Sequence, residues 1–85
     1  MTTDRIPVEV DAAWPEDTDE DEGVVVDWFV REGRELNEGD TLCEIQVEKV
    51  SVDVPAPASG TLVEILIGES EEFTRGDALG RIDPD

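Results

Sequence analysis

The residue best suited to chemistry in this chain is Lys49, because it is the only lysine and its amine is the one primary side-chain amine available. The chain has no histidine and no tyrosine, and Cys43 is its one cysteine. It therefore offers no nucleophile–base pair from which a catalytic centre could be assembled. A lone amine on an exposed turn is a candidate site of covalent modification, although taken alone an ordinary solvated lysine explains it better.

Two stretches with alternating apolar and polar residues flank Lys49, at positions 45–47 and 50–54. Alternation with a period of two is typical of half-buried strands. The alternation changes phase at Glu48 and Lys49, which are both polar. The pattern predicts two strands joined as a hairpin, with Lys49 at its tip.

The length and composition indicate one small domain without a membrane segment. A chain of 85 residues is typical of a single domain with a small core. No apolar run approaches the roughly 20 residues of a membrane helix, and the first residues lack the apolar centre of a signal peptide. We expect a cytoplasmic protein in which Cys43 is a small core residue.

The net charge of −18 is extreme for this length. It excludes nucleic-acid binding through phosphate neutralisation and disfavours anionic membranes. Self-repulsion of this size destabilises a compact chain, and salt relieves it by screening. We therefore expect a halophilic source. Charge-driven disorder is the alternative, but the apolar periodicity argues against it.

The remaining pattern predicts strands joined by turns, with no helical periodicity. Pro7 marks the first strand as an edge strand because proline cannot donate a ladder hydrogen bond. Leu36 and Phe73 are expected as single apolar anchors between turns. The expected strands are Ile6–Val10, Val24–Val30, Leu42–Val47, Val50–Val54, Thr61–Ile67 and Ala78–Ile82.

The acidic run Glu16–Glu22 is expected to be a surface loop anchored by Trp14. Its alternating aspartates are similar to a calcium-binding loop. An EF-hand requires glycine at the sixth position and glutamate at the twelfth, where this chain has Glu22 and Trp28. A solvated loop without a metal is the expectation.

The chain repeats itself after a shift of 37 residues, which places Gly23 on Gly60 and Ile45 on Ile82. The same shift places the turn 39–40 (Gly-Asp) on the turn 76–77 (Gly-Asp). Two similar all-β halves must bury their apolar faces against each other. The repeat predicts a sandwich or flattened barrel with pseudo-twofold symmetry, from one end of which the Lys49 hairpin projects.

These features together resemble the lipoyl domain of the biotinyl/lipoyl carrier family over Gly23–Ile82. In that family a modified lysine lies at a hairpin tip, sixteen residues after one glycine and eleven before another; Gly33 and Gly60 hold these places. The Gly-Asp pair at 39–40 and the Ala-Pro-x-x-Gly segment at 56–60 also match.

The resemblance implies two four-stranded antiparallel sheets in a single domain over residues 1–85, with a core of about residues 5–83 and an acidic loop at about 15–23. It implies that Lys49 receives lipoate in amide linkage from a lipoate-protein ligase or lipoyl transferase. Glu48 and Val50 replace the Asp and Ala that usually flank the family's lysine. Together with Gly33 and Gly60, they are the expected recognition features for the modifying enzyme.

The resemblance also implies a monomeric, non-catalytic carrier. Its lipoyl arm would move acyl groups and reducing equivalents between a 2-oxoacid dehydrogenase, an acyltransferase core and dihydrolipoamide dehydrogenase. The sequence does not select among pyruvate, 2-oxoglutarate and branched-chain 2-oxoacids. In the family the loop after the first strand helps partners choose their domain. Here the acidic residues of that loop would either steer a dehydrogenase toward the domain or only keep the surface solvated. These residues are Glu16, Asp17, Asp19, Glu20 and Asp21.

Several alternatives stay open at this point. A biotin carboxyl carrier shares the fold, but its lysine usually lies between methionines, and the only methionine here is Met1. A glycine-cleavage carrier is longer and carries extra helices. An unmodified interaction domain with the same fold is a third possibility. The chain is expected to be either a free-standing carrier, which we favour, or the N-terminal module of a longer acyltransferase.

Overall fold

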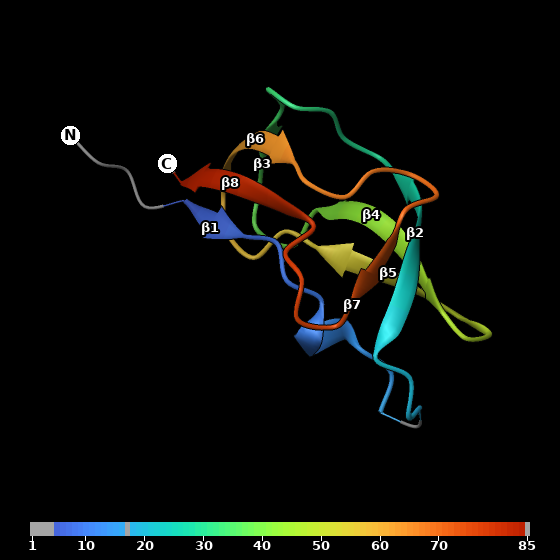
Figure 1. Ribbon diagram of the computed structural model, residues 1–85. Helices are drawn as coiled ribbons and strands as arrows, with labels where there is room; N and C mark the ends of the chain where they lie inside the picture. The colour runs from blue at the N-terminus through green and yellow to red at the C-terminus, as the bar shows by residue number, and fades with distance from the viewer. Residues whose placement is uncertain (1–4, 17, 85) are drawn as a thin grey trace.

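The computed structural model describes residues 5–16 and 18–84, which form two four-stranded antiparallel sheets (Figure 1). The strand orders are β1–β8–β6–β3 and β5–β4–β2–β7. The predicted fold class is confirmed. The strands are β1 (Ile6–Pro7), β2 (Glu22–Trp28), β3 (Glu35–Leu36), β4 (Thr41–Val47), β5 (Val50–Pro55), β6 (Gly60–Ile65), β7 (Glu72–Thr74) and β8 (Gly80–Pro84).

The internal repeat is confirmed down to individual hydrogen bonds. Exchanging the halves maps β2 on β6, β3 on β7 and β4 on β8, and turns one strand order into the other. Asp40 Oδ2 accepts a bond from the Asn37 N–H at 2.9 Å, and Asp77 Oδ2 accepts the equivalent bond from Thr74 at 2.9 Å. Ladder irregularities also recur at equivalent places in β2 and β6.

The apolar residues of the strands meet in one core between the sheets. Alternation explains this, because each strand directs every second side chain to the same face. Burying such faces supplies most of the favourable free energy of folding. The buried residues are Val8, Val10, Trp14, Val25, Leu36, Leu42, Cys43, Ile45, Val47, Val54, Ala56, Leu62, Phe73, Leu79 and Ile82.

The beginning of the chain differs from the sequence prediction. β1 covers only Ile6–Pro7 rather than Ile6–Val10, although Val8 still exchanges backbone hydrogen bonds with Gly80 and Leu79 of the neighbouring segment. The chain then forms one 3₁₀ turn, Asp11–Ala13, where no helix was predicted. A single turn is too short to produce a helical periodicity. β1 does lie at a sheet edge, as Pro7 predicted.

Short strands replace the two predicted apolar anchors. Leu36 and Phe73 are buried, as expected, but each lies in a strand, β3 and β7 respectively. Runs of two or three paired residues show no alternation in a sequence, so the pattern could not reveal them. Glu22, predicted to end the acidic loop, is the first residue of β2.

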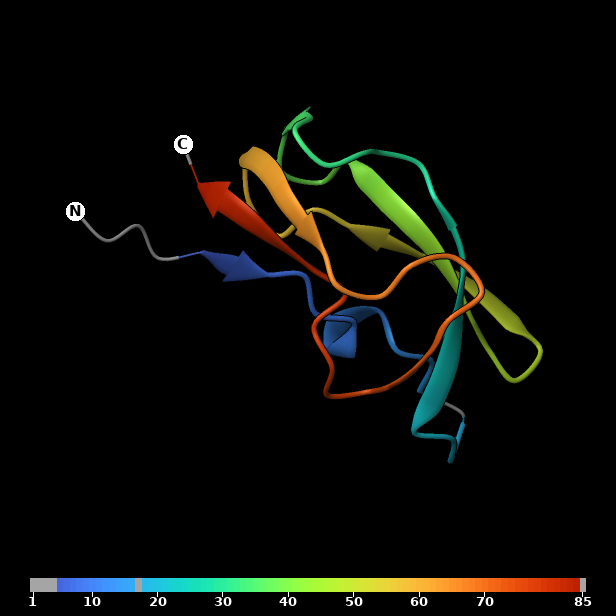
Figure 2. The ribbon, with the colours of Figure 1, turned by 45° about the horizontal axis from the view of Figure 1, so that its top comes forward.

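The β4–β5 hairpin projects from one end of the domain, and the paired strands β1 and β8 lie at the other (Figures 1 and 2). Both views show this separation. Within the described part of the chain, none of the helical structure is long and apolar enough to cross a membrane.

The charge density predicts a strong dependence of stability on salt. Among the described residues only two ion pairs occur, Arg75–Asp11 and Arg81–Glu64. Like charges also approach one another: a side-chain hydrogen bond with Asp27, together with the repulsion between the two carboxyl groups, raises the pKa of Glu69.

We expect the midpoint of thermal unfolding to rise by about 10 °C between low salt and 2 M KCl, because relieving about 2 kcal/mol of repulsion shifts a domain of this size by that amount. Calorimetry at several KCl concentrations checks this, and 2 M of an uncharged osmolyte separates screening from solute exclusion. A midpoint that is flat or falls with salt would contradict it.

Candidate functional site

The candidate site is the turn between β4 and β5. Val47 pairs with Val50 across the two strands, which leaves Glu48 and Lys49 as the two central residues of the turn. Val47 is fully buried, so the strand is fixed in the core up to the residue before the turn. The predicted hairpin with Lys49 at its tip is confirmed.

The side chain of Lys49 is exposed, and neither of the two ion pairs found among the described residues involves it. Its long, flexible stem therefore carries an accessible amine away from the fold. This arrangement fits a group attached covalently through the amine, because a tethered arm needs reach and freedom rather than an enclosing cavity.

The two residues beside Lys49 are exposed as well. Val50 is 46% exposed, although it begins a strand whose later apolar residue Val54 is fully buried. Glu48 has φ of 55° in the left-handed region, which costs a non-glycine residue roughly 1 kcal/mol. Both side chains are accessible to a modifying enzyme, and their role in its recognition stays a prediction.

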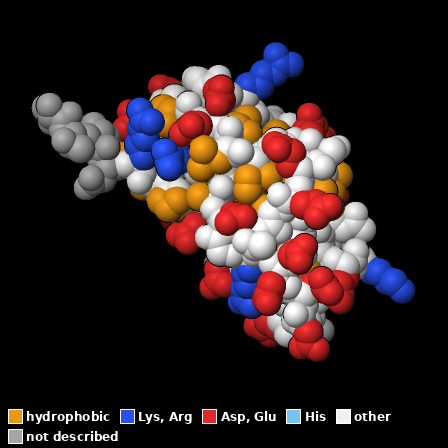
Figure 3. Space-filling view, viewed as in Figure 1, with side chains coloured by type: hydrophobic (Ala, Val, Ile, Leu, Met, Phe, Trp, Pro, Cys, Tyr) orange, Lys and Arg blue, Asp and Glu red, His pale blue; other side chains and the backbone are white. Residues whose placement is uncertain are grey.

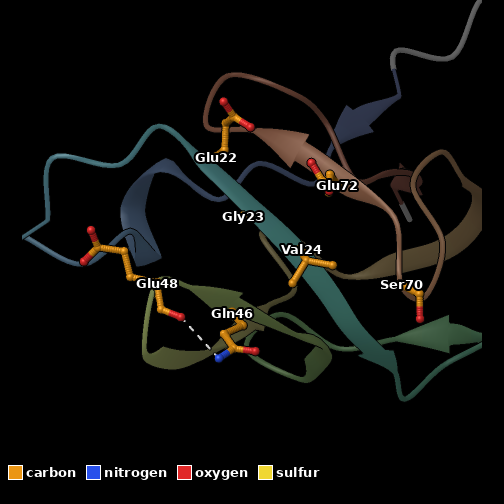
Figure 4. A pocket seen from close by; sticks show the side chains of 7 residues that line it. All are labelled: Glu22, Gly23, Val24, Gln46, Glu48, Ser70 and Glu72. Carbon is orange, nitrogen blue, oxygen red and sulfur yellow. Dashed lines mark hydrogen bonds between the residues drawn. The ribbon is translucent and has the colours of Figure 1, made fainter.

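A shallow open groove of about 430 Å³ lies beside the turn, on the outer face of the sheet that contains β4 (Figure 4). Strands β2, β4 and β7 and the turns next to them line it, so it borders the hairpin directly. The lining residues are Glu22, Gly23, Val24, Gln46, Glu48, Ser70 and Glu72. Three of the seven are glutamates, and Asp and Glu side chains are spread over the face drawn in Figure 3.

The acidic loop is held to the fold at the end that leads into β2. The indole N–H of Trp14 donates to the carbonyl oxygen of Glu20 at 3.0 Å, and the backbone N–H of Arg75 donates to that of Asp21 at 2.7 Å. The Trp14 ring packs edge-on against the Phe73 ring, with 6.0 Å between the two ring centroids. The Arg75 guanidinium lies 5.7 Å from the centroid of the Trp14 ring. The predicted anchoring role of Trp14 is confirmed.

Of the loop residues predicted to meet a partner, Glu16, Asp19, Glu20 and Asp21 are exposed, whereas Asp17 lies outside the described residues. The loop leads directly into Glu22, which lines the same groove as Glu48 of the lysine turn. The end of the loop and the turn therefore border one surface, and the role of the loop in partner choice stays a prediction.

Gly33 and Gly60, by contrast, lie away from the lysine turn. The Gly33 N–H donates to the carbonyl of Leu62 in β6, and Gly60 pairs with Pro84 near the end of β8. Gly33 has φ of 94°, and a Cβ on Gly60 would overlap the backbone of Asp83. The structure gives both glycines conformational roles; their proposed recognition by a modifying enzyme stays a prediction.

Three residues near the site were not singled out by the sequence. Gln46 bonds to the turn through its side chain, Arg75 helps to hold the loop, and Glu72 lines the groove. Each is a polar residue at an outward strand position or in a turn, where the sequence pattern predicts only exposure. The register between β2, β4 and β7 brings Glu72, Val24 and Gln46 into one row.

Cys43 is fully buried, and desolvation raises the pKa of its thiol to about 12. At neutral pH it is therefore an unreactive thiol of the core, as predicted. Within residues 5–16 and 18–84, no three His, Cys, Asp or Glu side chains are grouped so that they could hold a metal ion.

Comparison with known proteins places this geometry in a family. Residues 16–82 match the Biotin_lipoyl family, described as "Biotin-requiring enzyme". The chain is 42% identical over 62 residues, 73% of its length, to the dihydrolipoyllysine-residue acetyltransferase component of pyruvate dehydrogenase complex from Staphylococcus epidermidis and to that from Staphylococcus aureus. It spans 14% of the length of these relatives.

A solved structure shares the fold. The lipoyl domain of the 2-oxoglutarate dehydrogenase complex from Azotobacter vinelandii superimposes with a TM-score of 0.67 at 26% identity, and 92% of each chain is covered. The family match extends over most of the chain and includes the lysine hairpin. The chain therefore belongs to the Biotin_lipoyl family of carrier domains.

Proposed function

We propose that this protein is a lipoyl carrier domain and that lipoate is attached in amide linkage to Lys49. The observation that carries the proposal is the position of the chain's only lysine, exposed at the tip of a two-residue turn between paired strands. The names of the relatives support lipoate, since they are a dihydrolipoyllysine-residue acetyltransferase and a lipoyl domain.

In the attachment step the neutral amine of Lys49 attacks the carbonyl carbon of an activated lipoyl donor. The C–N bond forms, the leaving group departs with the electron pair of its bond to the carbonyl carbon, and the nitrogen loses a proton. The chain contributes the presentation of this amine, because Lys49 is exposed and takes part in neither of the ion pairs found among the described residues. A lipoate-protein ligase or lipoyl transferase supplies the activated donor.

Lys49 would hold the lipoyl group, which when bound would supply the dithiolane chemistry of a reductively acylated carrier. The proposed partners are a 2-oxoacid dehydrogenase, an acyltransferase core and dihydrolipoamide dehydrogenase. The relatives belong to pyruvate and 2-oxoglutarate dehydrogenase complexes by name. Modification removes the positive charge of Lys49, so the end of the domain that meets these partners becomes more acidic.

A paired ligase assay tests the proposal. The purified domain is incubated in high salt with ATP and either lipoate plus a lipoate-protein ligase or biotin plus a biotin-protein ligase, and its intact mass is measured. We expect one lipoyl group and no biotin. Addition of biotin alone would assign the domain to the second candidate, a biotin carrier, which the description of the matched family favours. Refusal of both groups would contradict the carrier function.

The acidic loop is proposed to steer the dehydrogenase toward the lysine turn, because it ends at the same groove. Replacing Asp19, Glu20 and Asp21 by their amides keeps side-chain size and removes three charges. We expect kcat/KM for reductive acylation to fall about tenfold at low salt, with the difference shrinking as salt screens the charges. Amide replacement of Glu35, Glu38 and Glu44 is the charge-matched control. Equal loss in both triple variants would contradict steering by the loop.

A further inference from the structure

Gln46 is the last outward-facing residue of β4 before the lysine turn, and its side chain extends toward the turn. Its Nε2 donates a hydrogen bond to the carbonyl oxygen of Glu48 at 3.2 Å. Figure 4 shows the amide and this carbonyl facing each other, whereas the Glu48 carboxylate points away from Gln46. The carbonyl belongs to the peptide group that joins Glu48 to Lys49. This peptide group lies directly before the Cα atom that carries the Lys49 side chain.

This peptide group is the part of the turn with a choice of orientation. The two turns favoured in two-residue hairpins, types I′ and II′, differ by a rotation of the peptide group between the central residues. Glu48 has φ of 55°, whereas Lys49 does not have a positive φ, and these signs of φ match type II′ rather than type I′, in which both are positive. Type II′ strongly prefers glycine at the first position, so a glutamate there needs an additional contact to hold the turn.

A neutral amide suits this task at position 46. Glu22 and Glu72 line the groove beside it, so a lysine or arginine would be drawn to their carboxylates, and a glutamate would have no proton to donate at neutral pH. In the other half of the repeat the equivalent residue is Asp83 in β8, so the amide occurs only in the half that contains the lysine turn.

We propose that Gln46 is a positioning residue for the modification of Lys49. Its amide holds the Glu48–Lys49 peptide group in one orientation and so fixes the direction in which the lysine side chain leaves the hairpin. The modifying enzyme then meets one arrangement of the amine instead of two. The inference rests on the proposed function, in which Lys49 is the attachment site.

The test compares Gln46→Met, which keeps the length of the side chain and removes the donor, with Ser51→Ala. Ser51 pairs with Gln46 across the β4–β5 ladder and is also exposed. With lipoate, ATP and a lipoate-protein ligase in high salt, we expect kcat/KM to fall about fivefold for Gln46→Met, the factor of a typical net hydrogen bond. Ser51→Ala should stay within about twofold of the parent.

Two further measurements separate positioning from general destabilisation. The ¹⁵N–¹H signal of the Lys49 amide should shift in Gln46→Met, while the midpoint of thermal unfolding falls by no more than the roughly 4–8 °C that the loss of one such bond costs, so the domain stays folded in the assay. In the Glu48→Gly background glycine favours type II′ by itself, so adding Gln46→Met should change kcat/KM less than twofold.

Three results would overturn the positioning role: an unshifted Lys49 amide, a parent-like rate for Gln46→Met, or the same rate loss in both backgrounds. The last would mean that the enzyme contacts Gln46 directly. Refusal of lipoate by the parent domain is a different outcome, because it contradicts the proposed function itself and, with it, this inference.

Discussion

Lys49→Arg is expected to abolish lipoylation and, with it, all reductive acylation by a 2-oxoacid dehydrogenase. Arginine keeps the positive charge and the long stem but offers no amine that can be deprotonated at working pH. The fold should be unaffected, because Lys49 is exposed and free of ion pairs among the described residues; surface substitutions of this kind stay within about 0.5 kcal/mol. Transfer of radiolabelled acyl groups to the ligase-treated domain measures the effect.

A displaced lysine is the matched control for this experiment. Arg31 lies in the exposed turn between β2 and β3, so the double variant Lys49→Arg/Arg31→Lys retains one exposed lysine and the same net charge. We expect the ligase to refuse it, because Lys49 alone lies at the tip of a paired hairpin. Lipoylation of the displaced lysine at the parent rate would show that the hairpin is not required.

Gly60→Ala is expected to lower the free energy of unfolding by about 3 kcal/mol, enough to unfold a large fraction of a small domain at low salt. A Cβ at Gly60 would lie 2.9 Å from the carbonyl carbon of Asp83 and from the Cα of Pro84, and closer still to the Asp83 carbonyl oxygen. These are backbone atoms of the paired strand β8, which cannot move without breaking the ladder.

Two other glycines provide graded controls for this substitution. Gly33 has φ of 94° but no neighbouring atom within 4 Å of an added Cβ, so alanine there should cost only about 1 kcal/mol. Gly76 has open space as well and no positive φ, so alanine there should be neutral or slightly stabilising. Urea unfolding of the three variants in 2 M KCl measures the series. Equal effects at Gly60 and Gly76 would contradict the close approach of β6 and β8.

The sequence predicted most of the fold because its two halves carry the same pattern. The 37-residue repeat, the alternation around Lys49 and the Gly-Asp turns each have a structural counterpart. The elements that it did not predict are short: the 3₁₀ turn at Asp11–Ala13 and the strands β3 and β7. Such segments are set by tertiary pairing rather than by local periodicity.

The candidate site was predictable only in part. Lys49 could be identified because it is unique and lies at a change of phase between two strands. The groove could not, because it depends on the register that brings Glu72, Val24 and Gln46 into one row across three strands. The bond from Gln46 to the Glu48 carbonyl depends on the turn conformation, which the sequence of a non-glycine turn does not determine.

The measurement that tests the central claim most directly is the mass of the domain purified from the organism that makes it, followed by tryptic mapping. Trypsin cleaves after an unmodified lysine, and the nearest arginines are Arg34 and Arg75. The proposal predicts one uncut peptide, residues 35–75, heavier by one lipoyl group localised to Lys49. Separate peptides 35–49 and 50–75 in a protein of unmodified mass, or a biotinyl group on Lys49, would contradict it.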